Sequence, residues 1–215
     1  MQRRKFIVID GMDGSGKGTQ LALLREALKD YPVYYTREPG GNGSDTAEFI
    51  RTVILKPESF NIAPVPLCDL FLFWASRAQH IEEVVEPKRA AGFHVLSDRY
   101  DSSTVAFQLY GEQKDFLTLF GSIRRAMPPT YWPDAYIILD LPAEVAYERR
   151  AKDAGQDKTR FDLKPIGYHA RVRAGFRFFK DLVVDPNTVH LIDANRSPEA
   201  VHAEVTALVR SILDA

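Results

Sequence analysis

Short apolar runs along this chain alternate with longer segments in which apolar residues return at every third or fourth position. This is the pattern of strands alternating with amphipathic helices. The runs predict strands at residues 6–10, 33–36, 94–97, 135–139 and 189–192. The longer segments predict helices at about 17–30, 44–56, 67–92, 113–126, 143–152, 165–183 and 198–213. Because strands separated by helices form covered parallel sheets, we expect a three-layer α/β/α fold with a five-stranded parallel sheet.

Length and composition suit one α/β domain. The chain has 215 residues, of which 45% are hydrophobic and 27% charged, so we expect a single domain over residues 1–215. The formal net charge of −1 argues against a broad surface for DNA or RNA. No apolar run is long enough to cross a membrane, and Cys68 is the single cysteine. We therefore expect a cytoplasmic protein with no nucleic-acid or membrane partner.

A glycine-rich loop follows the first predicted strand. Residues 11–19 read Gly-Met-Asp-Gly-Ser-Gly-Lys-Gly-Thr and lead directly into the first predicted helix. Glycines let backbone N–H groups converge on an anion, and the positive end of the helix points to the same place. Lys17 is placed to neutralise the β- and γ-phosphates of a nucleotide. The alternative is a glycine-rich turn with a surface lysine, but the flanking strand and helix favour a P-loop NTPase-type fold that binds a nucleoside triphosphate.

The loop departs from the usual pattern at one position. The residue after the lysine is usually Ser or Thr, whose hydroxyl binds Mg²⁺, and here it is Gly18. Thr19 comes next and is the candidate for that hydroxyl. The candidate nucleotide-binding residues of the loop are Gly11, Asp13, Gly14, Ser15, Gly16, Lys17, Gly18 and Thr19.

A second charged motif, Ser-Asp-Arg-Tyr at residues 97–100, follows the third predicted strand. We expect this strand to run parallel to the one before the glycine loop, so that both motifs reach the same edge of the sheet. There Asp98 could order Mg²⁺ or its waters, and Arg99 could form a two-pronged contact with a phosphate. A surface Asp–Arg pair in a turn is the alternative.

The helix predicted at 67–92 carries Arg77 in the middle of its apolar stripe. A cation on a buried face needs a partner or a ligand. Phe73 lies one turn earlier on the same side, so these residues could stack on a nucleobase and hydrogen-bond to it. A structural ion pair with an acid such as Asp98 or Glu38 explains the pattern equally well.

Two further segments place cations near the expected ligand edge. Residues 36–41 read Thr-Arg-Glu-Pro-Gly-Gly after the second predicted strand. Arg37 could bind a second phosphate there, although an ordinary exposed turn is the alternative. Residues 149–160 are polar and basic with a glycine hinge. They could form a flap that closes over the phosphates and excludes water, or a solvated loop.

Taken together, these motifs resemble the thymidylate kinase family from end to end. The matching stretches are residues 11–20, 36–41, 73–80, 98–108 and 133–140, the basic flap to Asp162, and residues 191–201. Several motifs in the right order are far more specific than a single phosphate loop. The resemblance implies a nucleoside monophosphate kinase of dTTP biosynthesis that phosphorylates dTMP to dTDP using ATP and Mg²⁺. It also implies a homodimer formed through the helix that carries Phe73.

The resemblance assigns roles around the acceptor nucleotide. It implies that Phe73 stacks on thymine and that Arg77 bonds the exocyclic oxygen of the base. It further implies that Thr104 or Gln108 meets the rest of the base edge and that Phe107 packs against the sugar where a 2′-hydroxyl would otherwise fit. The implied substrate-binding residues are Asp13, Arg37, Glu38, Phe73, Arg77, Arg99, Thr104, Phe107 and Gln108.

The phosphates, the metal and the adenine receive roles in the same way. The resemblance implies that Arg37 and Arg99 hold the acceptor phosphate. Asp13 is expected near the 3′-hydroxyl of the substrate and a water on the metal, and Asp98 supports the metal itself. Arg149 is expected to lie on the adenine.

Members of this family supply the catalytic arginine either from the phosphate loop, at the position of Gly14, or from a lid. The small Gly14 and the basic lid at about residues 150–162 imply the lid-supplied, bacterial-like type. Arg160 is the first choice for this arginine and Arg150 the second. The implied catalytic residues are Lys17, Arg99, Arg160, Asp13 and Arg150.

Two other functions stay open from the residues alone. One is a kinase for another pyrimidine monophosphate or for a nucleoside, although a nucleoside kinase would not need Arg37 and Arg99 for an acceptor phosphate. The other is a nucleotide-dependent switch without an acceptor, which would have no reason to place Arg77 on the inner stripe of a helix.

Overall fold

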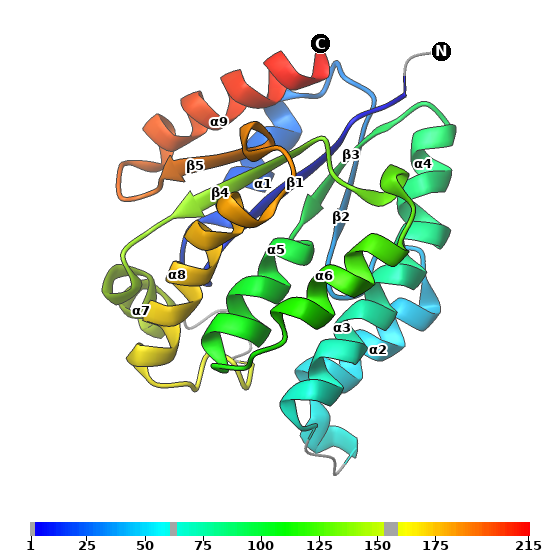
Figure 1. Ribbon diagram of the computed structural model, residues 1–215. Coiled ribbons are helices and arrows are strands. Elements are labelled where there is room, and N and C mark those ends of the chain that lie inside the picture. The colour runs from blue at the N-terminus through cyan, green and yellow to red at the C-terminus, as the bar shows by residue number, and fades with distance from the viewer. Residues whose placement is uncertain (1–2, 61–63, 153–158) are drawn as a thin grey trace.

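Parallel strands form the centre of the fold (Figure 1). The computed structural model describes residues 3–60, 64–152 and 159–215. Its sheet has the strand order β2-β3-β1-β4-β5. The strands are β1 (Phe6–Gly11), β2 (Val33–Arg37), β3 (His94–Asp98), β4 (Ala135–Asp140) and β5 (Val189–Asp193). The predicted five-stranded parallel sheet is confirmed, and each strand runs one residue further than the sequence pattern suggested.

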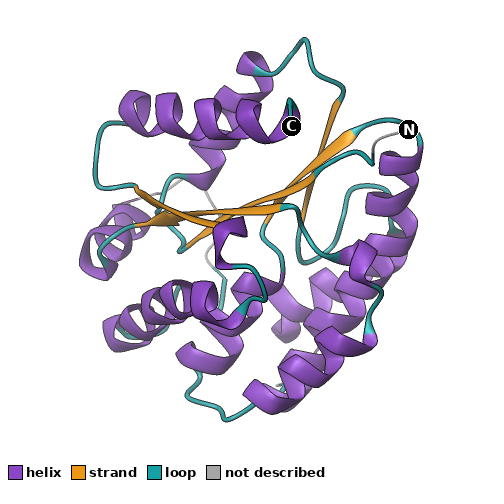
Figure 2. Cartoon of the chain, turned by 45° about the horizontal axis from the view of Figure 1, so that its top comes forward, coloured by secondary structure: helices purple, strands orange, loops and turns teal. Residues whose placement is uncertain are grey.

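Helices cover both faces of the sheet, which confirms the predicted three-layer arrangement (Figure 2). On one face α1 (Lys17–Ala27) packs against α9 (Pro198–Leu213). On the other, α8 (Ile166–Leu182) packs against the π-helical segment η3 (Thr104–Gly111). The other helices of four or more residues are α2 (Asp45–Leu55), η1 (Pro57–Phe60), α3 (Pro66–His80), η2 (Ile81–Val85), α4 (Glu86–Ala90), α6 (Leu117–Ala126) and α7 (Ala143–Lys152). None of the helices within the described ranges is long and apolar enough to cross a bilayer.

The long helix predicted at 67–92 is present but changes its winding. α3 continues through the π-helical turn η2 into α4. Pro87 has no N–H to give to the carbonyl four residues earlier, and a wider turn absorbs that missing bond. The backbone N–H of Glu86 accordingly donates to the carbonyl oxygen of Ile81, five residues back.

A helical stretch at 101–111, made of α5 (Asp101–Ser103) and η3, was missed by the sequence analysis. Its polar residues are buried: Asp101, Ser102 and Thr104 are all 0% exposed. The stretch therefore lacks the solvent-facing polar stripe by which a helix is recognised. In addition, the helix predicted at 113–126 begins only at Leu117.

The strand register brings the charged motifs to one edge of the sheet. Asp98 pairs with Ile9 of β1 on one side and with Arg37 of β2 on the other. β1 is buried along its whole length, so the loop that follows it starts from a fixed position. The phosphate loop, the end of β2 and the end of β3 therefore meet where parallel sheets bind ligands.

Candidate active site

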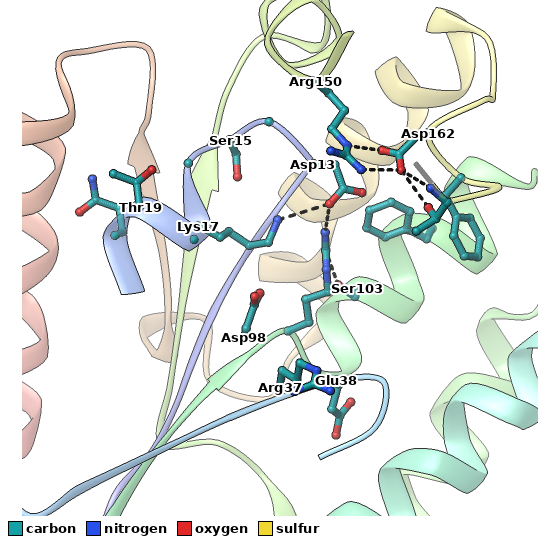
Figure 3. Close-up of a pocket in the computed structure, with 18 of the residues that line it drawn as sticks. Asp13, Ser15, Lys17, Thr19, Arg37, Glu38, Asp98, Ser103, Arg150 and Asp162 are labelled. Carbon is teal, nitrogen blue, oxygen red and sulfur yellow. Dashed lines mark hydrogen bonds and ion pairs between the residues drawn. The ribbon is translucent and has the colours of Figure 1, made fainter. Parts of the chain in front are cut away.

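A cavity of about 810 Å³ opens at the carboxyl edge of the sheet (Figure 3). Its size is typical of a small-molecule site. Most of the residues predicted from the sequence line it: Asp13, Gly14, Ser15, Gly16, Lys17, Gly18, Thr19, Arg37, Glu38, Phe73, Asp98, Arg99, Phe107, Gln108, Arg149 and Arg150. The predicted residues that do not line it are Gly11, Arg77, Thr104 and Arg160.

Lys17 lies inside the phosphate loop. Its Nζ donates to the carbonyl oxygens of Gly11 and Met12, both at 3.0 Å, and lies 3.8 Å from Oδ1 of Asp13. Burial, together with the nearby Arg99 guanidinium, lowers the pKa of Lys17. The backbone thus holds the ammonium group at the cavity wall, where an incoming phosphate would meet it.

The loop comes very close to α7 at Gly14. This residue has φ of 84°, and a Cβ there would overlap the carbonyl oxygen of Ala146 in α7. Only glycine satisfies both conditions. α7 also carries Arg149 and Arg150, both of which line the cavity. The absent side chain at Gly14 therefore lets these two arginines approach the phosphate loop.

Arg99 is held in an uncommon backbone conformation, with φ of 73°. Its Nη2 lies 2.6 Å from Oδ1 of Asp13, and its Nη1 donates to Oδ1 of Asp10 at 3.2 Å and to the carbonyl oxygen of Gly11 at 3.0 Å. Burial disfavours the charge, but the two acids more than offset it and raise the pKa of Arg99. Conversely, Arg99, Lys17 and Arg150 outweigh the burial of Asp13 and lower its pKa to about 2.

Asp10 is a part of this network that the sequence analysis missed, since it was interpreted only as the end of a strand. Its buried carboxylate accepts hydrogen bonds from the hydroxyls of Ser102, at 2.6 Å, and Ser103, at 2.9 Å. Burial raises the pKa of Asp10, against the opposing effect of Arg99. The available signal was a charged residue at the end of an otherwise apolar strand. The hydrogen bond from Nη1 of Arg99 to Asp10 therefore helps to fix the Arg99 guanidinium.

Asp98 offers an oxygen to a cation. Its Oδ1 is buried and has no hydrogen-bond partner in the part of the chain that the structure describes, and the residue lines the cavity. Among the described residues, no group of three or more His, Cys, Asp or Glu could hold a metal by itself. Mg²⁺ is commonly bound by one or two carboxylates together with substrate phosphates, so this donor fits it.

Thr19, the other predicted metal residue, points elsewhere. Figure 3 shows Thr19 on the far side of Lys17 from Asp98. The reason is helical geometry: residues two positions apart in α1 lie on nearly opposite sides of the helix. The structure therefore does not bring the hydroxyl of Thr19 to Asp98.

The Arg77 guanidinium is in an ion pair. It is 1% exposed, and its Nε donates to Oε2 of Glu38 at 2.8 Å. The other two nitrogens donate to Oγ1 of Thr104 at 3.1 Å and to the carbonyl oxygen of Tyr100 at 3.0 Å. One of the two explanations left open by the sequence, a structural pair with Glu38, is thus observed. Contact between Arg77 and a base stays a prediction.

The other residues predicted to bind the acceptor nucleotide line the cavity, and one of them is also paired with an acid. Phe73 and Phe107 line the cavity together with Gln108, whose buried Oε1 has no hydrogen-bond partner among the described residues. Arg37 lines it as well, but its Nη2 lies 2.9 and 3.0 Å from the two carboxylate oxygens of Glu48. A phosphate bound by Arg37 would therefore compete with Glu48.

The two arginines considered for the lid take different positions. Arg150 lines the cavity, and its Nε and Nη2 lie 2.7 and 3.0 Å from the oxygens of Asp162 (Figure 3). Arg160 instead bonds both oxygens of Asp69 in α3, at 2.7 and 2.6 Å. Its role as the catalytic lid cation stays a prediction that this arrangement does not favour. The part of the expected flap at residues 153–158 lies outside the described residues.

The fold and the cavity together define a nucleotide-binding protein of the P-loop class, with a row of cations between a phosphate loop and an aromatic-lined pocket. The family model described as Thymidylate kinase matches residues 9–205. The chain belongs to the thymidylate kinase family, which confirms the resemblance noted in its motifs.

Individual relatives agree with this assignment. The chain is 37% identical over 217 residues to a thymidylate kinase of Nitratidesulfovibrio vulgaris, covering 98% of each protein. It is 36% identical over 213 residues to one of Pelotomaculum thermopropionicum, covering 98% of this chain and 95% of the relative. The crystal structure of thymidylate kinase from Ehrlichia chaffeensis superposes with a TM-score of 0.72 at 27% identity, covering 97% of this chain and 99% of that one.

Proposed function

We propose that this chain transfers the γ-phosphoryl group of ATP to dTMP, giving ADP and dTDP. A phosphate oxygen of dTMP forms a bond to the γ-phosphorus, and the bond from that phosphorus to the bridging oxygen of ADP breaks. The observation that carries the proposal is that a phosphate loop and an aromatic pocket line one cavity, with Arg99 between them. The motif matches and the family membership point to the same reaction.

The chain's own cations supply the positioning and charge neutralisation that phosphoryl transfer needs. Lys17 faces the β- and γ-phosphates of the donor from within the loop. Arg99 faces the phosphate of the acceptor, since its bonds to Asp10 and Asp13 hold the guanidinium at the cavity wall. Arg149, which also lines the cavity, is assigned to the adenine side.

Arg150 is the cation that we assign to the transferring phosphoryl group. It lines the cavity and is near enough to Asp13 to help lower the pKa of that acid. A positioned arginine at this point is worth about 10³–10⁵ in rate in related reactions. Asp162 pairs with Arg150 in the structure. We expect the phosphates to displace Asp162 from this arginine because they carry more negative charge.

Asp98 is the residue that would hold Mg²⁺, together with oxygens of the bound phosphates. The metal would supply further neutralisation of the charge that builds up between the two phosphate groups. The buried Oδ1 of Asp98, which has no hydrogen-bond partner among residues 3–60, 64–152 and 159–215, supports this role. Because Gly18 provides no hydroxyl and Thr19 faces away, we assign no loop side chain to the metal.

The acceptor pocket is assigned to dTMP. Phe73 is the stacking partner of the base, Phe107 lies along the sugar, and Gln108 meets the base edge with an oxygen that bonds none of the described residues. We expect Arg77 to donate a further hydrogen bond to the base. Glu38 and Thr104 fix the orientation of its guanidinium.

An acceptor panel tests the proposal. Steady-state rates with ATP and Mg²⁺ are measured for dTMP, dUMP, dCMP, dAMP, dGMP and thymidine. We expect the highest kcat/KM for dTMP and no turnover of thymidine, because a nucleoside brings no phosphate to Arg99. Preference for a purine would contradict the thymine assignment. ATP hydrolysis without any acceptor would indicate a nucleotide-dependent switch.

We also propose a homodimer formed through α3. Leu67 and Phe71, four residues apart on this helix, are 40% and 49% exposed, which is unusual for large apolar side chains on one helix face. Light scattering of the wild-type protein should give twice the chain mass, and Phe71→Glu should give a monomer. Phe93→Glu is the matched control, because Phe93 is 39% exposed just before β3. A monomeric wild-type protein would contradict the proposal.

Two further expectations stay predictions. ATP as the preferred donor is tested by comparing ATP, GTP, CTP and UTP at fixed dTMP. The cytoplasmic location is tested by fractionating cells that express the protein at its natural level.

A further inference from the structure

We propose that Phe161 forms a third aromatic wall of the acceptor pocket, and that the ion pair between Asp69 and Arg160 holds it there. The inference rests on the proposed function and adds to it two positioning residues, Asp69 and Arg160, that do not touch the substrate. It also gives Arg160 a role different from that of a catalytic lid cation.

Phe161 lies between the two aromatic residues assigned to the acceptor. Its ring centroid is 6.2 Å from that of Phe73 and 6.1 Å from that of Phe107, with interplanar angles of 56° and 73°. It is 7% exposed and lines the cavity. The three rings come from separate parts of the chain, α3, η3 and the segment before α8, so only the fold brings them together. Edge and tilted contacts of this kind are favourable geometries for aromatic pairs.

Arg160 fixes the segment that carries Phe161. Its Nη1 and Nη2 bond the two carboxylate oxygens of Asp69 at 2.7 and 2.6 Å, and its Nε donates to the carbonyl oxygen of Ile54 at 2.9 Å. The guanidinium also lies 4.5 Å from the centroid of the Phe161 ring. A two-pronged contact of this type sets both distance and orientation, which a lysine could not do.

Asp69 ties this segment to the acceptor helix. It lies in the first turn of α3, one turn before Phe73, and is 5% exposed. The ion pair therefore joins the backbone around Phe161 to the helix that carries the stacking residue. A change at Asp69 or Arg160 should alter the spacing of the Phe73 and Phe161 rings although neither residue lines the cavity.

The three rings would enclose the deoxyribose and the base in apolar surface. Such a wall offers no partner to an additional hydroxyl, which would lose its water without gaining a hydrogen bond. It also excludes water from the neighbouring phosphates. The pair should therefore affect binding of the acceptor and its discrimination from a ribonucleotide, and leave the donor site unchanged.

The test compares Phe161→Leu, Asp69→Asn, Arg160→Ala and Arg160→Lys with the wild-type protein, measuring kcat and the KM values for dTMP, dUMP, UMP and ATP. We expect the KM for dTMP to rise about 10-fold, the value for about 1.4 kcal/mol of lost binding. The KM for ATP should stay unchanged, and the preference for dUMP over UMP, which differ only by the 2′-hydroxyl, should fall. The double variant Asp69→Asn/Arg160→Ala should be no worse than either single variant, because both remove one interaction.

Arg173→Ala is the matched control. Arg173 forms a two-pronged pair of the same kind with Asp140, at 2.8 and 2.9 Å, at the end of β4. It should leave both KM values unchanged, and thermal unfolding shows whether each variant is folded. An unchanged KM for dTMP in Phe161→Leu would overturn the inference. So would a kcat loss of about 100-fold or more in Arg160→Ala at unchanged KM, which would return Arg160 to catalysis. A wild-type protein inactive on dTMP would instead contradict the proposed function itself.

Discussion

The guanidinium of Arg99 lies 2.6 Å from the carboxylate of Asp13, which joins the end of β3 to the phosphate loop. The Arg99 side chain is only 15% exposed, so its charge could not be left without a partner in this position. The same carboxylate also lies 3.8 Å from the Lys17 ammonium. The negative charge of Asp13 therefore offsets the positive charges of Lys17, which we assign to the donor phosphates, and Arg99, which we assign to the acceptor phosphate.

Arg99 should be sensitive even to a conservative change. Arg99→Lys keeps the charge but loses the planar fork that can contact Asp13 or a phosphate at two points. We expect kcat with dTMP to fall by about 10²–10³, as for loss of one donor that stabilises a transition state. Arg177→Lys, at a side chain 57% exposed on α8, is the control and should be fully active. Wild-type turnover in Arg99→Lys would exclude the assigned role.

Gly14 should tolerate no side chain. Gly14→Ala combines a left-handed backbone with an overlap with Ala146, so we expect a loss of about 1–3 kcal/mol in the free energy of unfolding. Gly18→Ala is the control, because Gly18 lies in α1 and a Cβ there meets nothing within 4 Å. It should raise the free energy of unfolding by about 0.5–1 kcal/mol. Urea denaturation measures both values, and equal effects of the two changes would refute this explanation.

The metal requirement should depend on Asp98 and be independent of Thr19. Asp98→Asn should raise the Mg²⁺ concentration needed for half-maximal activity by about 10–100-fold, since a carboxylate oxygen is replaced by a neutral one. Thr19→Val should leave it unchanged, because its hydroxyl lies on the far side of Lys17. Titrating Mg²⁺ at fixed ATP and dTMP measures both. A shift in the Thr19 variant with none in the Asp98 variant would reverse the assignment.

Asp13 should make stability depend on pH below about 4. Its pKa in the folded protein is about 2, below the ordinary 3.8, so the ionised carboxylate stabilises the fold above pH 3.8. This contribution decreases as the pH falls from 3.8 toward 2. Asp13→Asn should therefore lower the free energy of unfolding at pH 7, and its difference from wild type should shrink on acidification.

Urea denaturation at pH 7, 5, 4 and 3 measures this difference. Asp30→Asn, at an exposed position after α1, is the control and should follow the wild-type protein at every pH. A difference that grows on acidification would contradict the assigned ion pairs of Asp13.

The sheet and the phosphate loop could be predicted because short, continuous stretches of sequence determine both. β1 and β4 consist mainly of continuous apolar runs, the other strands contain shorter ones, and the loop follows β1 without a break. The helical stretch at 101–111 could not be recognised in the same way, since its polar residues are buried, and the hydroxyls of Ser102 and Ser103 donate to Asp10 rather than to solvent. Its polarity reflects a buried network that exists only after the sheet has formed.

The partners of the cations were the least predictable part of the site. Arg150 and Arg160 are both basic residues of the same predicted lid, and nothing near them in the sequence separates their roles. In the structure Arg150 pairs with Asp162. Arg160 pairs with Asp69, which lies 91 positions away from it along the chain. Contacts over such a distance depend on how α3 packs, which no local pattern encodes.

Binding of both nucleotides at once is the central claim, and calorimetric titration tests it most directly. The protein is first saturated with a non-hydrolysable ATP analogue and Mg²⁺, and dTMP is then added. We predict that dTMP binds this complex at one site per chain, as it binds the free protein. Loss of dTMP binding in proportion to the bound analogue would contradict the account, since it would mean that the cavity holds only one nucleotide at a time.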